Sequence, residues 1–187
     1  MLKPFRRAQR KTALVVGLGN VGHPYKNTRH NVGFLVVDAL AQRLLATWTV
    51  KSKFHAEIAE GKQESAKVIL AKPTTLMNRS GQAVEALVSF YKPEMLLVVH
   101  DEADLTFGDI RVKTGGGSAG HNGLNSIVEH LGPDFTRVRV GIGHSPNPKI
   151  SLEDWVLGKW SEEEQAKLDG VVQGALDTIL SHIAPPP

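Results

Sequence analysis

The sequence predicts an α/β fold: a single-domain three-layer sandwich in which helices flank a mixed, mostly parallel central sheet. Apolar runs of strand length alternate along the chain with segments whose apolar residues recur at helical spacing. The chain has 187 residues, no internal repeat and no linker long enough to divide it. These observations favour one domain.

The first predicted elements are a strand, a helix and a broken strand pair. Residues 12–18 form a short apolar run that ends at Gly-Asn, as a buried strand does. Residues 32–46 place apolar side chains three and four positions apart, which predicts an amphipathic helix. Residues 48–60 alternate loosely and break near Ser52, so they are predicted to form two strands.

A turn at residues 61–64 leads into the next predicted strand, residues 66–71, which Pro73 stops. Asn78 is a candidate N-cap for a helix that continues to Tyr91. The sequence therefore places a strand, a loop and a helix in succession here.

The second half repeats this alternation. Residues 95–99 are continuously apolar, as expected of a strand buried on both faces. Residues 109–114 alternate as a strand before a glycine-rich stretch, and residues 124–131 are predicted as a helix. A strand at residues 135–142 and a terminal helix at residues 161–183 follow, the latter opened by a Ser-x-x-Glu capping box.

Charge is unevenly distributed. Residues 1–11 contain five basic residues and no acidic ones. They are predicted to form a disordered basic arm before a single domain at residues 12–187, with a short targeting remnant as the alternative. The net charge of +3 permits a nucleic-acid partner without requiring one.

The composition excludes several classes of protein. The chain has no cysteine, which removes disulfides, thiolate nucleophiles and cysteine-ligated metals and favours a cytoplasmic protein. No apolar run approaches the ~18 residues of a membrane span, so we expect no membrane partner.

Polar residues gather where predicted strands end. They are Asn20, Asn78, Asp101, His121 and Asn122. Ligands of open α/β sheets bind beyond the carboxyl ends of strands, so this coincidence predicts a site there. The alternative is that turns simply favour Asn and Asp.

A histidine and a carboxylate are the candidate reactive groups. His30 lies in a polar loop, and Asp101 ends the most buried strand, where a carboxylate needs a partner. An imidazole held by a carboxylate can take a proton from water. The sequence leaves open whether Asp101 pairs with His30, His100 or His121, and a metal site that also includes His23 is an alternative.

Two further patterns suggest ligands. The glycine pattern at residues 17–22 matches a dinucleotide-binding turn, but Pro24 and the loop that follows argue against that site. Arg111 and Lys113 share one strand face, and Arg137 and Arg139 repeat the arrangement. Two such strands side by side would form a cationic patch suited to phosphate.

Several of these residues belong to motifs that occur together. In chain order they are Gly17-Leu-Gly-Asn-Val-Gly22 with Tyr25, Thr28-Arg-His-Asn31 before Gly33, Lys72-Pro-Thr-Thr-Leu-Met-Asn-Arg-Ser-Gly81, Val99-His-Asp-Glu-Ala-Asp104, Gly115-Gly-Gly-Ser-Ala-Gly-His-Asn-Gly123, Arg137-Val-Arg-Val-Gly-Ile-Gly-His144 and Trp155-Val-Leu-Gly158. With them, residues 12–182 resemble the bacterial-type peptidyl-tRNA hydrolases. Val21 and Leu76 stand where that family usually has Pro and Phe.

The resemblance implies a monomer that hydrolyses the ester between a peptide and the 3′ end of tRNA, without a metal or cofactor. His30 would be the general base, Asp101 would hold it, and Asn20 would distinguish N-blocked from free aminoacyl-tRNA. The implied contacts with the terminal region of the substrate come from Tyr25, Leu76, Asn78 and Asn122, with Met77 and His121 lining the same cleft. Lys113 and Arg139 would clamp the 5′-phosphate of the acceptor stem.

Two alternatives to this function remain from the sequence. One is a hydrolase-like RNA-binding protein that has lost catalysis, and the other is a nucleotide-binding oxidoreductase. The presence of Asn20, His30, Asn78 and Asp101 argues against the first.

Overall fold

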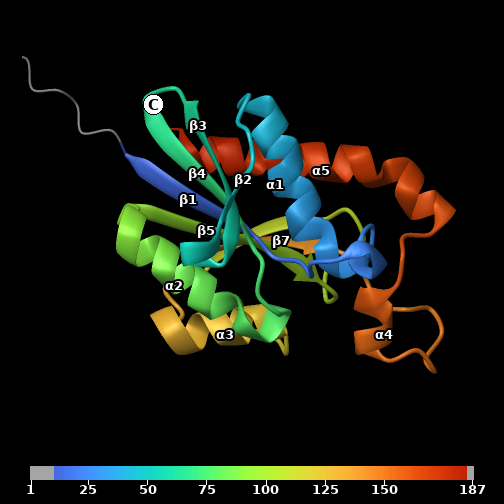
Figure 1. The fold of residues 1–187 in the computed structure, drawn as a ribbon. Helices are drawn as coiled ribbons and strands as arrows, with labels where there is room; N and C mark the ends of the chain where they lie inside the picture. Colours follow the sequence, from blue (N-terminus) through green and yellow to red (C-terminus); the bar gives the residue numbers. More distant parts are fainter. Residues whose placement is uncertain (1–10, 185–187) are drawn as a thin grey trace, which may run out of the picture.

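The computed structural model describes residues 11–184 and shows the predicted α/β sandwich (Figure 1). The predicted basic arm lies outside the described residues, apart from Lys11. One sheet contains seven strands in the order β2-β3-β4-β1-β5-β7-β6. The strands are β1 (Thr12–Gly17), β2 (Thr49–Lys51), β3 (Ala56–Gln63), β4 (Ala66–Pro73), β5 (Met95–Glu102), β6 (Ile110–Thr114) and β7 (Thr136–Gly141).

The centre of the sheet is parallel. Strand β1 lies between β4 and β5, and β7 follows β5 in the same direction. Strands β3 and β6 run antiparallel to their neighbours. The carboxyl ends of β1, β4, β5 and β7 therefore meet at one end of the sheet, which is where ligands bind in this kind of fold.

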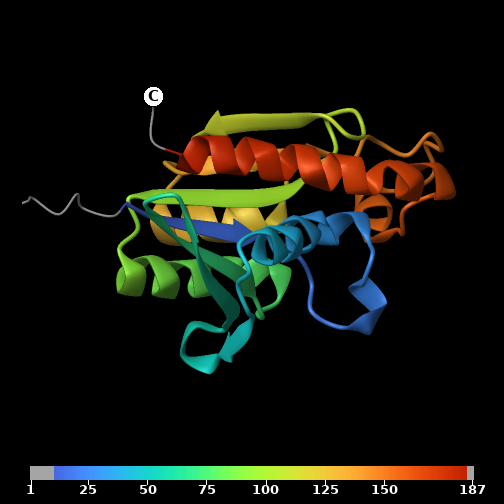
Figure 2. The same cartoon turned by 90° about the horizontal axis from the view of Figure 1, so that it is seen from above.

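Helices cover both faces of the sheet, α1 and α5 on one and α2 and α3 on the other (Figures 1 and 2). The helices are α1 (Val32–Arg43), α2 (Ser80–Tyr91), α3 (Asn122–Leu131), α4 (Leu152–Leu157) and α5 (Glu162–Ile183). Two apolar cores result, because alternate strand residues point to opposite faces. Val15 and Val99 pack in the core that contains α1 and α5, whereas Leu14 and Val98 pack in the core that contains α2 and α3.

The terminal helix α5 follows the sequence prediction closely. The Ser161 hydroxyl accepts the backbone N–H of Glu164, and the Glu164 carboxylate accepts that of Ser161, which completes the capping box. Among residues 11–184, no helix combines the length and apolarity that crossing a membrane requires.

The turn predicted at residues 61–64 is placed too early. Strand β3 continues through Gln63, which pairs with Ala66 of β4, so the hairpin turns at Glu64 and Ser65. Glu64 has a φ of 52°, in the left-handed region that two-residue hairpin turns use. The cross-strand register overrides the turn-forming composition of the preceding residues.

Asn78 does not cap α2, contrary to the prediction. It lies inside a 3-10 turn at Met77–Arg79, and α2 begins at Ser80 with no side-chain cap from Arg79. The Ser80 hydroxyl instead donates to the Met77 carbonyl over 2.8 Å. The chain thus enters the helix through a tightened turn.

The end of β1 packs against the start of α1 with no room for a side chain. A Cβ on Gly33 would lie 2.5 Å from the backbone N and O of Leu18 and from the Val99 carbonyl oxygen. A Cβ on Gly17 would lie 2.3 Å from the Gly33 carbonyl oxygen. The glycines therefore serve helix–strand packing. The loop after Gly22 passes through 3-10 turns before α1 begins, unlike a dinucleotide-binding turn, which opens directly into its helix.

Replacing Gly33 by alanine should therefore destabilise the fold. We expect Gly33→Ala to lower the free energy of unfolding by about 1–3 kcal/mol, the usual range for overpacking. Gly170→Ala in α5 is the matched control, because a Cβ there would meet nothing within 4 Å. That variant should gain ~0.5–1 kcal/mol from helix propensity. Urea unfolding measures both, and an unchanged stability of Gly33→Ala would contradict the close packing.

Candidate active site

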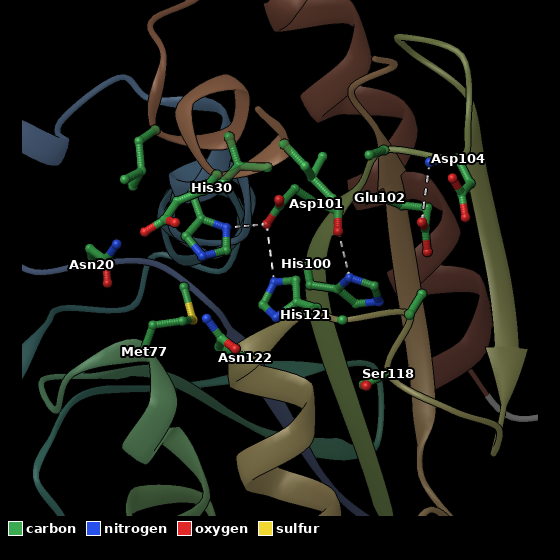
Figure 3. A pocket seen from close by; sticks show the side chains of 17 residues that line it. Asn20, His30, Met77, His100, Asp101, Glu102, Asp104, Ser118, His121 and Asn122 are labelled. Atoms are coloured by element: carbon green, nitrogen blue, oxygen red, sulfur yellow. Dashed lines mark hydrogen bonds and ion pairs between the residues drawn. The ribbon is translucent and has the colours of Figure 1, made fainter. Parts of the chain in front are cut away.

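A cavity of about 390 Å³ opens at the carboxyl ends of β1 and β5 (Figure 3). The predicted site residues that line it are Asn20, His30, Met77, Asp101, His121 and Asn122. The structure places the remaining predicted residues outside its lining, namely Tyr25, Leu76, Asn78, Lys113 and Arg139. The first set forms a site around reactive groups, whereas the second lies on the surrounding surface or strands.

Asp101 is the centre of the site and contacts two imidazoles. Its Oδ1 accepts a hydrogen bond from His30 Nδ1 over 2.9 Å and another from His121 Nε2 over 3.1 Å. Figure 3 shows the two rings converging on this carboxylate from different segments of the chain. The Asp101 side chain is only 3% exposed. Of the partners that the sequence left open, His30 and His121 therefore both reach the carboxylate.

The tautomers of the two rings follow from their partners. The backbone N–H groups of Gly123 and Leu124, in the first turn of α3, both donate to His121 Nδ1, over 3.1 and 3.3 Å. This nitrogen must be an acceptor, so Nε2 carries the proton that His121 donates to Asp101. His30 donates through Nδ1, which leaves Nε2 unprotonated in its neutral ring. The site therefore presents one imidazole nitrogen that can take up a proton.

These hydrogen bonds keep the carboxylate ionised. Burial alone would favour the neutral acid, but the attraction and hydrogen bonds of His121 and His30 hold the pKa of Asp101 well below its usual range. A third ring, His100, donates from Nδ1 to the Asp101 carbonyl oxygen over 2.7 Å. Burial and the neighbouring His121 ring lower the pKa of His100 to about 3, so its contact is that of a neutral ring.

Asn20 is held by a side chain that the sequence did not single out. Asn31 Oδ1 accepts the backbone N–H of Asn20 over 2.8 Å, and Asn31 Nδ2 donates to the Asn20 carbonyl over 2.9 Å. This reciprocal pair ties the end of β1 to the turn that carries His30. It fixes the backbone of Asn20 while its own carboxamide lines the cavity.

The prediction that the site residues all follow strands at the same end of the sheet needs two corrections. Asp101 lies within β5, which extends to Glu102 because β7 pairs with it along that length. Strand β6 runs antiparallel to β7, so its last residue, Thr114, lies at the opposite end of the sheet. The glycine-rich stretch then returns the chain to the site, where His121 caps α3.

The cationic strand residues have different environments. Strands β6 and β7 lie side by side, so Arg139 is diagonally opposite Lys113 across this strand pair. Its Nε donates to the Glu102 carboxylate over 2.9 Å, whereas Lys113 is exposed. Arg137 is buried, and its guanidinium donates to the carbonyls of Gly116 and Gly117. Arg137 therefore stabilises the glycine-rich stretch and does not belong to an exposed patch.

The sequence analysis missed the wall of the cavity that α4 forms. Leu152, Val156 and Leu157 line it from this short helix. A signal was present: Ser151 precedes Leu-Glu-Asp, and its hydroxyl accepts the Asp154 backbone N–H over 3.1 Å. Six residues are too few for an apolar periodicity to stand out. The opposite wall, from the glycine-rich stretch and the end of β5, comes from Glu102–Asp104 and Ser118–Gly120.

One group among the described residues could converge on a metal ion. The potential ligand atoms of His30, Asp101 and His121 lie within 4.8 Å of one another. The ring nitrogens that face Asp101 are the donors of its two hydrogen bonds. A metal at this position would have to displace both protons, and His121 Nδ1 is occupied by the amides of α3. The donor set therefore suits proton transfer better than metal coordination.

The fold and the cavity define a single-domain α/β protein whose site holds an imidazole against a buried carboxylate. A family model described as "Peptidyl-tRNA hydrolase" matches residues 14–184. A peptidyl-tRNA hydrolase of Gloeobacter violaceus is 47% identical over 174 residues, which cover 91% of this chain and 87% of that protein. The Lactiplantibacillus plantarum protein of the same name is 47% identical over 174 residues, with coverage of 91% and 92%.

Solved structures agree with this comparison. The crystal structure of peptidyl-tRNA hydrolase from Acinetobacter baumannii aligns with a TM-score of 0.81 at 45% identity, covering 92% of this chain and 86% of that one. The chain therefore belongs to the peptidyl-tRNA hydrolase family.

The ionised Asp101 should make the free energy of unfolding depend on pH in the acidic range. Its folded pKa lies below the unfolded value of about 3.9, so the unfolded chain takes up the proton first as the pH falls. The stability that Asp101 contributes is present above about pH 4 and is lost below it. The unfolding free energy of the wild type should thus fall more steeply between about pH 5 and about pH 3 than that of Asp101→Asn.

Urea unfolding at stepped pH values measures the two slopes. Asp104→Asn is the control, because its carboxylate is exposed and bonds to the exposed His144. That variant should keep the wild-type slope. Parallel curves for the wild type and Asp101→Asn would show that the Asp101 carboxylate is not held ionised.

Proposed function

We propose that this chain hydrolyses the ester of peptidyl-tRNA, releasing peptide and free tRNA and so recycling tRNA from stalled or aborted translation. The observation that carries the proposal is the His30–Asp101 pair, in which the carboxylate fixes Nδ1–H and leaves Nε2 to accept a proton at a cavity. Membership of the peptidyl-tRNA hydrolase family supports the choice of substrate.

In this reaction His30 acts as the general base. Its Nε2 takes a proton from water while the water oxygen attacks the acyl carbon of the ester. The bond between that carbon and the ribose oxygen then breaks, and the proton passes to the leaving ribose oxygen. Asp101 stabilises the imidazolium that forms in between. General-base catalysis of this kind typically contributes about 10²–10⁴-fold, and positioning supplies much of the rest.

The surrounding residues would bind and select the substrate. The Asn20 carboxamide lines the cavity beside His30, where we propose that it distinguishes an N-acyl group from a free amine. Met77 and His121 line the same cleft. The terminal region of the substrate would contact side chains of the cavity and its rim, namely Tyr25, Leu76, Asn78 and Asn122.

The tRNA acceptor stem would lie along β6 and β7. Arg139 is opposite His100 in the β5–β7 register, so this strand pair leads from the cavity to the cationic residues. Lys113 is exposed on β6, beside Gly116, where a backbone can approach closely. We propose that Lys113 and Arg139 clamp the 5′-phosphate, which gives affinity without sequence readout.

We further propose that the enzyme needs neither metal nor cofactor and acts as a monomer in the cytoplasm. The two imidazole nitrogens that face Asp101 carry protons, which they donate to its carboxylate, so a metal ion at this position would have to displace both protons.

His30→Ala should lower kcat by about 10²–10⁴-fold, because the general base is lost. The assay is release of free tRNA from N-acetyl-aminoacyl-tRNA, with and without EDTA. The control His182→Ala removes an exposed imidazole from α5 and should retain wild-type turnover. Unchanged turnover of folded His30→Ala would remove His30 as the base, and sensitivity to EDTA would favour a metal. Wild-type protein that binds tRNA without hydrolysis would fit the inactive RNA-binding alternative.

Lys113→Ala should weaken substrate binding more than chemistry. We expect KM to rise about two- to fivefold with kcat unchanged, which corresponds to the ~0.4–1 kcal/mol of an exposed ion pair. Lys167→Ala, which removes an exposed lysine from α5, should leave both constants unchanged. The effect of Lys113→Ala should disappear on a substrate whose tRNA lacks the 5′-phosphate. An equal effect on both substrates would exclude the clamp.

A further inference from the structure

The turn that carries His30 has little regular structure of its own. Arg29–Asn31 form one 3-10 turn of three residues between a loop and α1. Its position therefore depends on contacts with other parts of the chain. Asn31 is bonded to Asn20, and His30 to Asp101. The remaining member, Arg29, faces away from these partners and contacts the C-terminal part of the chain.

Arg29 is buried and is held on three sides. Its guanidinium donates to both carboxylate oxygens of Glu164, from Nη2 over 2.6 Å and from Nε over 3.3 Å. Its Cζ lies 3.6 Å from the centroid of the Trp155 ring, a cation–π contact. The backbone N–H of Arg29 donates to the Gly158 carbonyl over 3.0 Å. A bidentate, stacked guanidinium fixes orientation as well as distance.

Glu164 connects this guanidinium to a rigid element. Glu164 Oε2 accepts the hydrogen bond from Arg29 Nη2. The same oxygen accepts the backbone N–H of Ser161 over 2.7 Å, in the capping box of α5. Helix α5 has 22 residues and is anchored in the core through side chains such as Leu176 and Ile179. The first turn of this helix is thus joined through one carboxylate to the residue before His30.

We propose that Glu164 is a positioning residue for catalysis, which acts through Arg29 to hold His30 against Asp101. This inference rests on the proposed function. Arg29 and His30 are adjacent in a three-residue turn, so the contacts of the guanidinium constrain the same short backbone segment that carries the imidazole. Displacements of the order of 1 Å are enough to reduce catalysis markedly. The second anchor, Trp155, keeps Arg29 in the same place from α4, whose other side chains line the cavity.

Glu164→Gln tests the proposal, because it keeps the size of the side chain and an oxygen for the cap but removes the charge. We expect kcat to fall about tenfold, equivalent to ~1.4 kcal/mol, with KM within about twofold of the wild type. Glu163→Gln makes the same charge change on the same turn, at an exposed position, and should keep wild-type kcat. Arg29→Lys, which keeps the charge but loses the bidentate fork, should lower kcat as Glu164→Gln does.

A further variant separates positioning from helix stability. Ser161→Ala removes the hydroxyl that accepts the Glu164 N–H over 3.2 Å, but it leaves the Glu164 carboxylate in place. It should lower Tm and keep wild-type kcat at temperatures well below that Tm. An equal loss of kcat in Ser161→Ala and Glu164→Gln would overturn the proposal in favour of a structural role, as would wild-type kcat in Glu164→Gln.

A readout without substrate distinguishes this inference from the proposed function. In ¹⁵N-edited NMR spectra, the His30 Nδ1–H signal should be sharp in the wild type and broadened by exchange in Glu164→Gln, with the His121 Nε2–H signal less affected. A sharp, unshifted His30 signal in the variant would overturn the positioning role even if the wild type proves inactive on peptidyl-tRNA.

Should Glu164→Gln fail to fold, Gly158→Ala decides the matter from the other side. A Cβ on Gly158 would lie 2.9 Å from Arg29 Nη1 and 3.1 Å from the Trp155 carbonyl oxygen, so it crowds the guanidinium without changing any charge. It should reproduce the loss of kcat and the broadening, and wild-type values for both would overturn the proposal.

Discussion

A buried carboxylate is the constraint on which the site depends. Asp101 lies at the end of a central parallel strand, where an ion without partners would be strongly unfavourable. Two imidazole donors reach it, from the turn before α1 and from the start of α3, and a third ring bonds to its backbone carbonyl. His30 and His121 lie 71 and 20 positions from Asp101 in the sequence. Satisfying one ionised group therefore determines where the ends of three elements must meet.

The same constraint gives the two histidines different chemistry. His30 and His121 donate to one oxygen, so each commits one nitrogen to Asp101. The other nitrogen of His121 accepts two backbone N–H groups at the start of α3, and that ring can only hold its proton. His30 lies before α1 without such amide donors, so its second nitrogen stays open to water. The amides at the start of α3, and not the carboxylate, therefore distinguish the two imidazoles.

Much of this could be predicted from the sequence, and the exceptions share a physical cause. Apolar spacing located the strands and long helices, and the proximity of Asn20 and Asp101 follows from parallel strands ending together, whereas the partner of Asp101 was left open. Alternation has no direction, however, so the antiparallel course of β6 could not be predicted, and His121 reaches the cavity through the glycine-rich stretch instead. Spacing could not separate buried Arg137 from accessible Arg139 either, because three-dimensional contacts with glycine carbonyls decide that difference.

The end of β5 connects the two parts of the proposed site. Side chains alternate along a strand, so Asp101 and Glu102 point to opposite faces. Asp101 meets the turn of His30, whereas Glu102 meets Arg139 on the neighbouring strand over 2.9 Å. The spacing between Asp101, which holds His30, and Arg139 is therefore determined by paired strands. A substrate that places its phosphate on β6 and β7 would have its ester located by the same sheet. The turn of His30 is not part of the sheet, so its position depends on contacts with other elements, such as that of Arg29 with Glu164 of α5.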